Sequence, residues 1–120
     1  MHHIGIDIVE IARIEQAIMQ WRDSFLKRIY TEAELATSSN RIPSLAANFA
    51  AKEAVMKALG TGTKGVGWRE IEVVSDPNGK PLIQLHGRAR SKANEIGISD
   101  FSISLSHTRE YAVASAVGNT

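Results

Sequence analysis

The alanine-rich run FAAKEAVMKALGTG at residues 49–62 constrains the fold of this 120-residue chain more than any other segment. Such a run is typical of a buried helix, and it stops at a glycine, the residue that most often ends a helix. Pro43 fits the first helical position, where its missing N–H costs nothing. The sequence therefore predicts a helix of about four to five turns that begins near Pro43 and ends at Gly60.

Charged residues lie within and beside the apolar stripe of this helix. The stripe consists of Leu45, Phe49, Met56 and Leu59. Lys52 falls inside it, and Glu53 and Lys57 flank it. The simpler interpretation is an exposed Glu53–Lys57 pair worth about 0.3–0.5 kcal/mol, with the Lys52 stem extended along apolar surface to reach water. The other interpretation is a functional site.

The segments before this helix predict a strand followed by short helices. Alternation over residues 3–9 predicts a strand in which the isoleucines form the buried face and Asp7 points to the opposite face. Helical spacing follows over residues 10–20. A second helix over residues 25–29 is expected to be capped by Asp23 or Ser24, and Thr31 with Glu34 matches a capping box that begins a third.

The segments after this helix predict mainly strands. The expected elements are a loop at 40–44, a glycine-rich loop at 60–67, a hairpin of strands 68–75 and 81–85, a helix over 87–96, and strands over 101–105 and 111–117. Helices and strands do not alternate strictly, so we predict an α+β fold. We expect a single small domain over residues 1–120, with a mainly antiparallel sheet packed against the long central helix.

The composition argues against several classes of protein. Fourteen basic and thirteen acidic residues give a formal net charge of +1, which offers no global charge for binding nucleic acid or an anionic membrane. The absence of cysteine excludes disulfides, thiolate metal sites and cysteine nucleophiles. We expect neither a membrane span nor a secretory leader, and we expect a cytoplasmic location.

Asp7 and Glu53 are candidate metal ligands. Packing the helix on the sheet could bring both carboxylates to one edge. Mg²⁺ is typically bound by one or two carboxylates together with substrate phosphates and water. Lys57, one turn beyond Glu53, adds positive charge beside this predicted metal site.

The glycine-rich loop and the histidines carry weaker signals. Gly60, Gly62 and Gly65 follow a helix instead of a strand, which excludes a dinucleotide-binding fingerprint, and Val66 stands where a phosphate-binding Walker loop needs lysine. His107, between two hydroxyl residues at a predicted strand end, is either a reactive group or a turn residue that caps backbone groups. The remaining histidines are expected to be structural, and they are His2, His3 and His86.

Several motifs together resemble the 4′-phosphopantetheinyl transferases. They are Ile4-Gly5-Ile6-Asp7, Phe49-Ala50-Ala51-Lys52-Glu53-Ala54 with Lys57, and Gly60-Thr61-Gly62. The turn Asn78-Gly79-Lys80-Pro81 and the closing segment Ser104-Leu105-Ser106-His107-Thr108 are similar to the small type of this family, the holo-acyl-carrier-protein synthases. The resemblance covers nearly the whole chain.

This resemblance implies an enzyme of fatty acid biosynthesis. It would move 4′-phosphopantetheine from coenzyme A to a serine of apo acyl carrier protein and release adenosine 3′,5′-bisphosphate. Asp7 and Glu53 would bind Mg²⁺, and Lys57 would neutralise phosphate charge. Glu53 or a Mg²⁺-bound water would take the serine proton. The coenzyme would contact Lys52, Lys57, Gly60, Thr61, Gly62, Gly79, Lys80, Pro81, Ser106, His107 and Thr108.

The resemblance also implies partners. Members of the family form trimers that bind the coenzyme between subunits, and the acidic helix of the carrier protein would dock on Arg13, Arg22 and Arg28. Many members carry arginine where this chain has Asn48, so the cation that anchors the coenzyme 3′-phosphate is open, with Lys52, Lys64 and Arg69 as candidates. The alternative function is a non-catalytic module that binds acyl carrier protein or coenzyme A.

Overall fold

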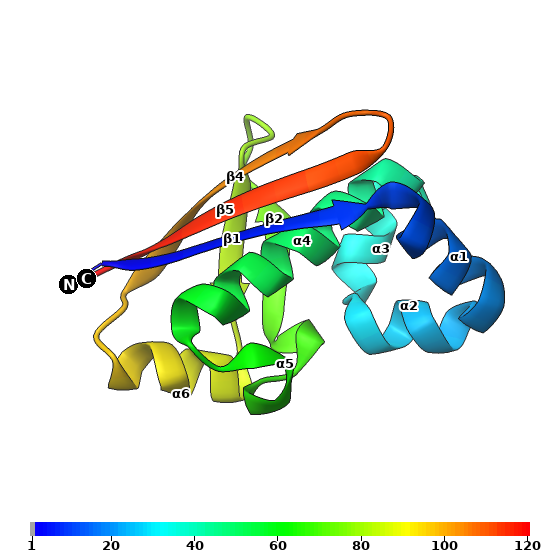
Figure 1. Cartoon of the computed structure of the whole chain (residues 1–120). Coiled ribbons are helices and arrows are strands. Elements are labelled where there is room, and N and C mark those ends of the chain that lie inside the picture. The colour runs from blue at the N-terminus through cyan, green and yellow to red at the C-terminus, as the bar shows by residue number, and fades with distance from the viewer. Residues whose placement is uncertain (1) are drawn as a thin grey trace.

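The computed structural model describes residues 2–120, and it contains two antiparallel sheets and a long central helix (Figure 1). One sheet has the strand order β1-β5-β4, formed by β1 (His3–Glu10), β5 (Tyr111–Asn119) and β4 (Asp100–His107). The other is a hairpin of β2 (Ile71–Ser75) and β3 (Pro81–Leu85). Every strand pair is antiparallel, which confirms the predicted α+β class.

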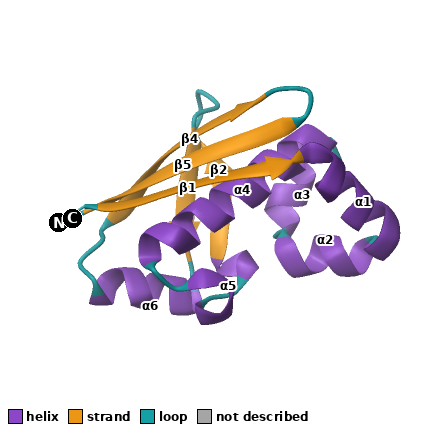
Figure 2. Ribbon diagram, viewed as in Figure 1, coloured by secondary structure: helices purple, strands orange, loops and turns teal. Residues whose placement is uncertain are grey.

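The central helix α4 (Ile42–Leu59) lies along one face of the three-stranded sheet (Figure 2). The other helices are α1 (Ile11–Trp21), α2 (Asp23–Ile29), α3 (Glu32–Ser38), the single-turn α5 (Gly62–Gly65) and α6 (Gly87–Glu95). Helices α1 to α3 gather at one end of the molecule. Helices α5 and α6 lie near each other toward the other end, below the three-stranded sheet in the view of Figure 1. Within residues 2–120, no helix is both long enough and apolar enough to cross a membrane.

Small residues allow α4 to approach the sheet closely. Ala50, Ala51 and Ala54 of the helix are fully buried, as are the inward-facing alanines of β5. A Cβ atom placed on Gly5 of β1 would overlap the carbonyl oxygen of Ala54. Glycine is therefore required at this position, and the close contact fixes β1 against the helix that carries Glu53.

The expected orientation of β1 is wrong. Gly5, Asp7 and Val9 face α4 and are buried. Ile4, Ile6 and Ile8 lie on the outer face of the sheet and are 62–65% exposed in the single chain. The alternation of the strand is confirmed, but its apolar side faces away from the helix.

Several predicted element bounds also differ from the structure. The expected loop at 40–44 is shortened because α4 begins at Ile42, with Pro43 in its first turn. Neither Asp23 nor Ser24 caps α2, because the N-cap position is Arg22 with φ of +48° and no side-chain hydrogen bond. Part of the glycine-rich loop forms α5, and a 3₁₀ turn over Trp68–Glu70 replaces the start of the expected strand 68–75. The Thr31–Glu34 capping box and the end of α4 at Gly60 are confirmed.

Candidate active site

Asp7 projects from the inner face of β1 toward α4. It stands opposite Ala114 of β5, where the small neighbouring side chain leaves room for a carboxylate. Its side chain is only 10% exposed and receives a hydrogen bond from Lys57 Nζ to Oδ1 at 3.1 Å. A buried carboxylate on the helix-facing side of a sheet requires positive partners, and α4 supplies one of them.

Glu53 and Lys57 lie one helical turn apart on α4, as the sequence predicts. Lys57 Nζ also donates to the carbonyl oxygen of Ile6 at 2.9 Å, so two of its three donors hold β1 against the helix. Its side chain remains 55% exposed. The ammonium is therefore fixed in position while one donor stays available to a ligand.

The two carboxylates influence each other. Burial raises the pKa of Glu53, and the nearby Asp7 carboxylate raises it further by its negative charge. Lys57 and Arg13 oppose this shift. No donor among residues 2–120 forms a hydrogen bond or ion pair with the Glu53 carboxylate, because Lys57 contacts Asp7 instead. The pair therefore carries excess negative charge.

This donor set fits Mg²⁺. Two oxygen ligands from the protein suffice for an ion that keeps water and binds substrate phosphate. No group of three or more His, Asp or Glu side chains suited to a metal ion occurs within the described chain. A complete protein cage is thus absent from residues 2–120, and a ligand with phosphate oxygens would have to complete the coordination shell.

A pocket of about 430 Å³ opens beside the carboxylates. Asp7, Glu53 and Arg13 line it together with Phe25 and Phe49. Phe49 stacks on Trp68 with ring centroids 4.7 Å apart and on Phe25 at 6.5 Å. This stack of rings could not be predicted from the sequence, because the rings come from three separate segments.

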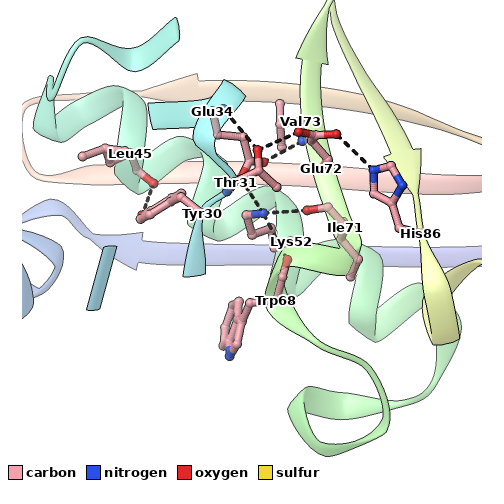
Figure 3. A network of polar contacts seen from close by, with 10 residues as sticks. All are labelled: Tyr30, Thr31, Glu34, Leu45, Lys52, Trp68, Ile71, Glu72, Val73 and His86. Atoms are coloured by element: carbon pink, nitrogen blue, oxygen red, sulfur yellow. Dashed lines mark hydrogen bonds and ion pairs between the residues drawn. The ribbon is translucent and has the colours of Figure 1, made fainter. Parts of the chain in front are cut away.

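Lys52 does not take the position predicted for it. Its side chain is fully buried, and its Nζ forms an ion pair with Glu34 Oε1 at 2.8 Å. The remaining donors bind the carbonyl oxygens of Ile71 at 2.6 Å and Trp68 at 3.1 Å (Figure 3). The prediction that Lys52 reaches water is wrong, and so is its predicted contact with the coenzyme, because all three donors are used inside the protein.

The Lys52–Glu34 pair joins three parts of the chain. Glu34 Oε2 accepts the backbone N–H of Val73 at 2.7 Å, and Oε1 accepts that of Thr31 at 2.8 Å. Thr31 Oγ1 donates in turn to Glu72 Oε2 at 2.6 Å (Figure 3). Burial lowers the pKa of Lys52, and the Glu34 charge opposes that shift. The pair therefore ties α3 and β2 to α4 next to Glu53.

A second pocket of about 360 Å³ contains part of the predicted coenzyme site. Gly79 and Pro81 from the β2–β3 hairpin line it, as do Ser106 and His107 at the end of β4. Asn48 of α4 also lines it, whereas the adjacent Phe49 lines the first pocket. Consecutive residues of α4 thus separate the two pockets.

Other predicted coenzyme residues lie outside the lining of this second pocket. Lys80 is exposed, and its backbone N–H donates to Asp76. The Thr108 hydroxyl oxygen accepts hydrogen bonds from the backbone of Glu110 and Tyr111 in the β4–β5 turn. Their contact with a coenzyme stays a prediction.

Gly60, Thr61 and Gly62 form the connection after α4. Gly60 has φ of +77° and Gly62 has φ of +62°, a conformation that favours glycine. The Thr61 hydroxyl donates to the carbonyl oxygen of Gly62 at 3.1 Å. None of these residues lines either pocket, so their approach to a ligand stays a prediction as well.

The three predicted docking arginines lie on different hollows of the helical region. Arg13 lines the carboxylate pocket, and Arg28 lines a neighbouring hollow that shares Ala17 and Phe25 with it. Arg22 lines a larger hollow of about 970 Å³ with the exposed side chains Met19 and Trp21. The arginines therefore surround an exposed surface of α1 and α2 that is partly apolar.

Known proteins resemble this chain over nearly its whole length. Residues 3–116 match the family model described as the 4′-phosphopantetheinyl transferase superfamily. A holo-[acyl-carrier-protein] synthase of Herpetosiphon aurantiacus is 50% identical, over 95% of this chain and 95% of its own length. One of Dehalococcoides mccartyi is 52% identical, over 98% of each chain.

Solved structures show the same fold. The Helicobacter pylori holo-[acyl-carrier-protein] synthase in complex with coenzyme A has a TM-score of 0.88 and 36% identity, covering 97% of this chain and 99% of that one. The Bacillus anthracis enzyme in complex with "CoA (3′,5′-ADP)" has a TM-score of 0.78 and 37% identity, covering 97% and 94%.

Proposed function

Because the chain belongs to the 4′-phosphopantetheinyl transferase superfamily, we propose that Asp7, Glu53 and Lys57 form the centre at which it transfers 4′-phosphopantetheine from coenzyme A to a serine of apo acyl carrier protein. The observation that carries this assignment is the meeting of two carboxylates from β1 and α4 beside a fixed, exposed lysine. Phosphoryl transfer depends mainly on positioning and on charge neutralisation, and this centre offers both.

Asp7 and Glu53 are the residues that would hold Mg²⁺. When bound, the ion supplies positive charge to the diphosphate oxygens of coenzyme A. Lys57 contributes its free donor to the same phosphates, while its other donors keep Asp7 and β1 in place. Burial and the neighbouring Asp7 carboxylate raise the pKa of Glu53, and a bound cation would offset both effects.

The transfer exchanges one phosphorus–oxygen bond for another. The carrier serine oxygen bonds to the phosphorus of the pantetheine phosphate, and the bond from that phosphorus to the bridging oxygen of the diphosphate breaks. Adenosine 3′,5′-bisphosphate leaves, and the serine proton moves to a base. Glu53 is the proposed acceptor, because it lines the same pocket as Arg13, where the carrier would dock.

The remaining predicted coenzyme contacts are assigned to the second pocket and its surroundings. Ser106, His107, Gly79 and Pro81 would surround the adenosine half of the coenzyme. Lys80 and Thr108 would contact it from the adjacent turns. Gly60, Thr61 and Gly62 would approach its phosphates with their backbone.

The outer face of the sheet is proposed to be the interface of a homotrimer. Ile4, Ile6 and Ile8 of β1 and Val117 of β5 leave an apolar strip exposed in the single chain. Contiguous apolar surface of this kind typically marks an interface. Copies of the same chain are the proposed occupants, because the family resemblance implies a trimer.

Ile6→Glu is expected to convert the trimer to single chains, because each interface would bury an unpaired carboxylate. The measurement is the mass in solution by light scattering at fixed protein concentration. Met19→Glu is the matched control. Met19 is exposed in the single chain to a similar extent as Ile6, 70% against 62%, but it lies on α1 and outside the proposed interface. The proposed interface would be contradicted if the unmodified protein had the mass of a single chain, or if the Ile6→Glu variant had the mass of a trimer.

The carrier protein is proposed to dock on the surface formed by Arg13, Arg22 and Arg28. Positive charge on this surface complements an acidic helix. Met19 and Trp21, which are 70% and 58% exposed, add apolar contact area between the charges. Arg13 also lines the carboxylate pocket, so a carrier held there would present its serine to Glu53.

Arg13→Glu is expected to weaken carrier binding by about tenfold or more, because it places like charges opposite each other. The affinity for coenzyme A should change by less than about twofold, because the Arg13 side chain is assigned to the carrier and not to the coenzyme. Lys92→Glu on α6 is the control for the change in net charge. Calorimetric titration of each ligand measures both effects, and an equal loss for both ligands would place Arg13 outside the docking surface.

The proposed setting of the reaction is fatty acid biosynthesis in the cytoplasm. The test of the function is the intact mass of several apo acyl carrier proteins after incubation with this protein, coenzyme A and Mg²⁺, with and without chelator. A gain of one phosphopantetheine that the chelator abolishes is expected. Binding of coenzyme A without any gain would instead favour the non-catalytic binding module.

A further inference from the structure

An aromatic ring stands beside the two charged residues of α4. Phe49, Glu53 and Lys57 lie at intervals of four residues, so they follow one another along the same face of the helix. Phe49 and Glu53 line the same pocket, and both are half-buried. The Phe49 side chain is therefore the neighbour of the Glu53 carboxylate on the side away from Lys57.

Trp68 supports the Phe49 ring, although Trp68 itself does not line the carboxylate pocket. The two ring centroids are 4.7 Å apart, and the angle between the ring planes is 23°. Phe25, which does line the pocket, lies against Phe49 with a centroid distance of 6.5 Å and an angle of 25°. Aromatic pairs favour particular mutual orientations. The position of the Phe49 ring therefore depends on a residue outside the pocket.

The 3₁₀ turn that carries Trp68 is held from two sides. Nζ of the buried Lys52 donates to the carbonyl oxygens of Trp68 at 3.1 Å and of Ile71 at 2.6 Å, which lie at the two ends of the turn (Figure 3). The Glu70 carboxylate accepts the backbone N–H of Arg88 at 2.8 Å, and this contact ties the turn to α6. Trp68 therefore has a fixed place relative to α4.

We propose that Trp68 is a positioning residue that keeps the Phe49 ring beside Glu53, so that phosphopantetheine passes to the carrier serine and water is excluded as the acceptor. This inference rests on the proposed function. A serine that docking holds in the pocket already has an advantage of position over water. The ring adds to this advantage, because it occupies space beside the proposed base that water molecules would otherwise fill.

The side reaction that the ring would suppress is hydrolysis of coenzyme A. A water oxygen bonds to the phosphorus of the pantetheine phosphate, and the bond from that phosphorus to the bridging oxygen of the diphosphate breaks. One proton of the water moves to the base. The products are free 4′-phosphopantetheine and adenosine 3′,5′-bisphosphate, so the two reactions differ only in where the phosphopantetheine goes.

The test measures the share of phosphopantetheine that is released free instead of being attached to the carrier. Chromatography quantifies both products after the full chain is incubated with coenzyme A, Mg²⁺ and apo acyl carrier protein. Trp68→Leu keeps an apolar side chain but removes the ring. It is expected to raise the free share by about 2- to 10-fold, the range that corresponds to the strength of an aromatic pair.

A second aromatic residue should restore the stack. Trp68→Phe is expected to keep the free share within about twofold of the unmodified chain, because it retains a ring against Phe49. The KM for coenzyme A should change by less than about twofold in both variants, because Trp68 is assigned no contact with the coenzyme. A change in the free share without a change in KM would distinguish positioning from a general loss of structure.

Phe101→Leu is the matched control, because it removes a ring of β4 that is 6% exposed and lies outside the stack. It should lower the melting temperature and leave the free share unchanged. If Trp68→Leu does not fold, Phe49→Leu tests the same stack and should raise the free share in the same way.

The role of Trp68 would be overturned if the variant that lacks the ring kept the free share of the unmodified chain, or if Phe101→Leu raised this share equally. In either case a modified carrier would leave the proposed function standing. An unmodified chain that modifies no carrier would contradict the function itself.

Discussion

Glu53→Gln is expected to lower turnover by about 100-fold or more, the scale of a lost general base, and to weaken the Mg²⁺ dependence of the reaction. The same substitution should leave the melting temperature unchanged or slightly higher. Burial and Asp7 raise the pKa of Glu53, so its ionised form is unfavourable in the folded chain, and a neutral amide removes that cost. Loss of activity with retained stability is the signature of a residue selected for function.

Steady-state kinetics over a range of Mg²⁺ concentrations and thermal unfolding measure the two effects on one preparation. Glu95→Gln is the matched control, because Glu95 is 71% exposed and lies on α6, away from Asp7 and Glu53. Turnover and metal dependence that stay unchanged in Glu53→Gln would refute both the metal role and the base role. A large fall in melting temperature would indicate a structural role instead.

Lys52→Met is expected to destabilise the chain by about 3–5 kcal/mol, the cost of leaving a buried charge without its partner. Glu34 is fully buried, and after the substitution its carboxylate would keep only the backbone donors of Thr31 and Val73. The carbonyl oxygens of Trp68 and Ile71 would also lose a donor. Urea unfolding at fixed protein concentration measures the change in the free energy of unfolding.

The double variant Lys52→Met with Glu34→Gln should recover part of this loss, because it removes both buried charges together. Lys92→Met is the control, since this lysine is 34% exposed and makes one long surface contact, and it should change stability by less than about 0.5 kcal/mol. Unchanged stability in Lys52→Met, with coenzyme A affinity lost, would restore the interpretation of Lys52 as a coenzyme ligand.

The order of elements could be predicted because each leaves a local signal. The capping box at Thr31, the glycine that ends α4 and the alternation of the strands all act within a few residues. The pairing of Asp7 with Glu53 and Lys57 required one further assumption, that α4 packs on the sheet beside β1. Gly5 permits that packing, because only glycine allows the observed approach to Ala54.

The orientation of β1 could not be predicted in the same way. Alternation distinguishes two faces of a strand but does not say which face meets the helix. The expectation that the isoleucines of β1 are buried within the chain is wrong. The face with Gly5 meets α4 instead, because glycine has no side chain to hold the helix away from the strand. If the outer face joins other chains, its isoleucines are still buried, but between copies.

Lys52 illustrates what helical spacing leaves out. Helical spacing places Lys52 in the apolar stripe, but its partner Glu34 lies on another helix and its carbonyl partners lie beyond α4. Contacts distant in sequence decide the role of Lys52, so a single sequence without its fold does not reveal that role.

Calorimetric titration of coenzyme A into the full chain and into Asp7→Asn, with Mg²⁺ and with chelator, tests whether Asp7 and Glu53 are the metal site. We predict that Mg²⁺ tightens coenzyme A binding to the unmodified chain and that a chelator removes this gain. Asp7→Asn should bind with similar affinity in both conditions, because one of the two carboxylate ligands is lost. Equal affinity of the unmodified chain with Mg²⁺ and with chelator would contradict the assignment of Asp7 and Glu53 as the metal site.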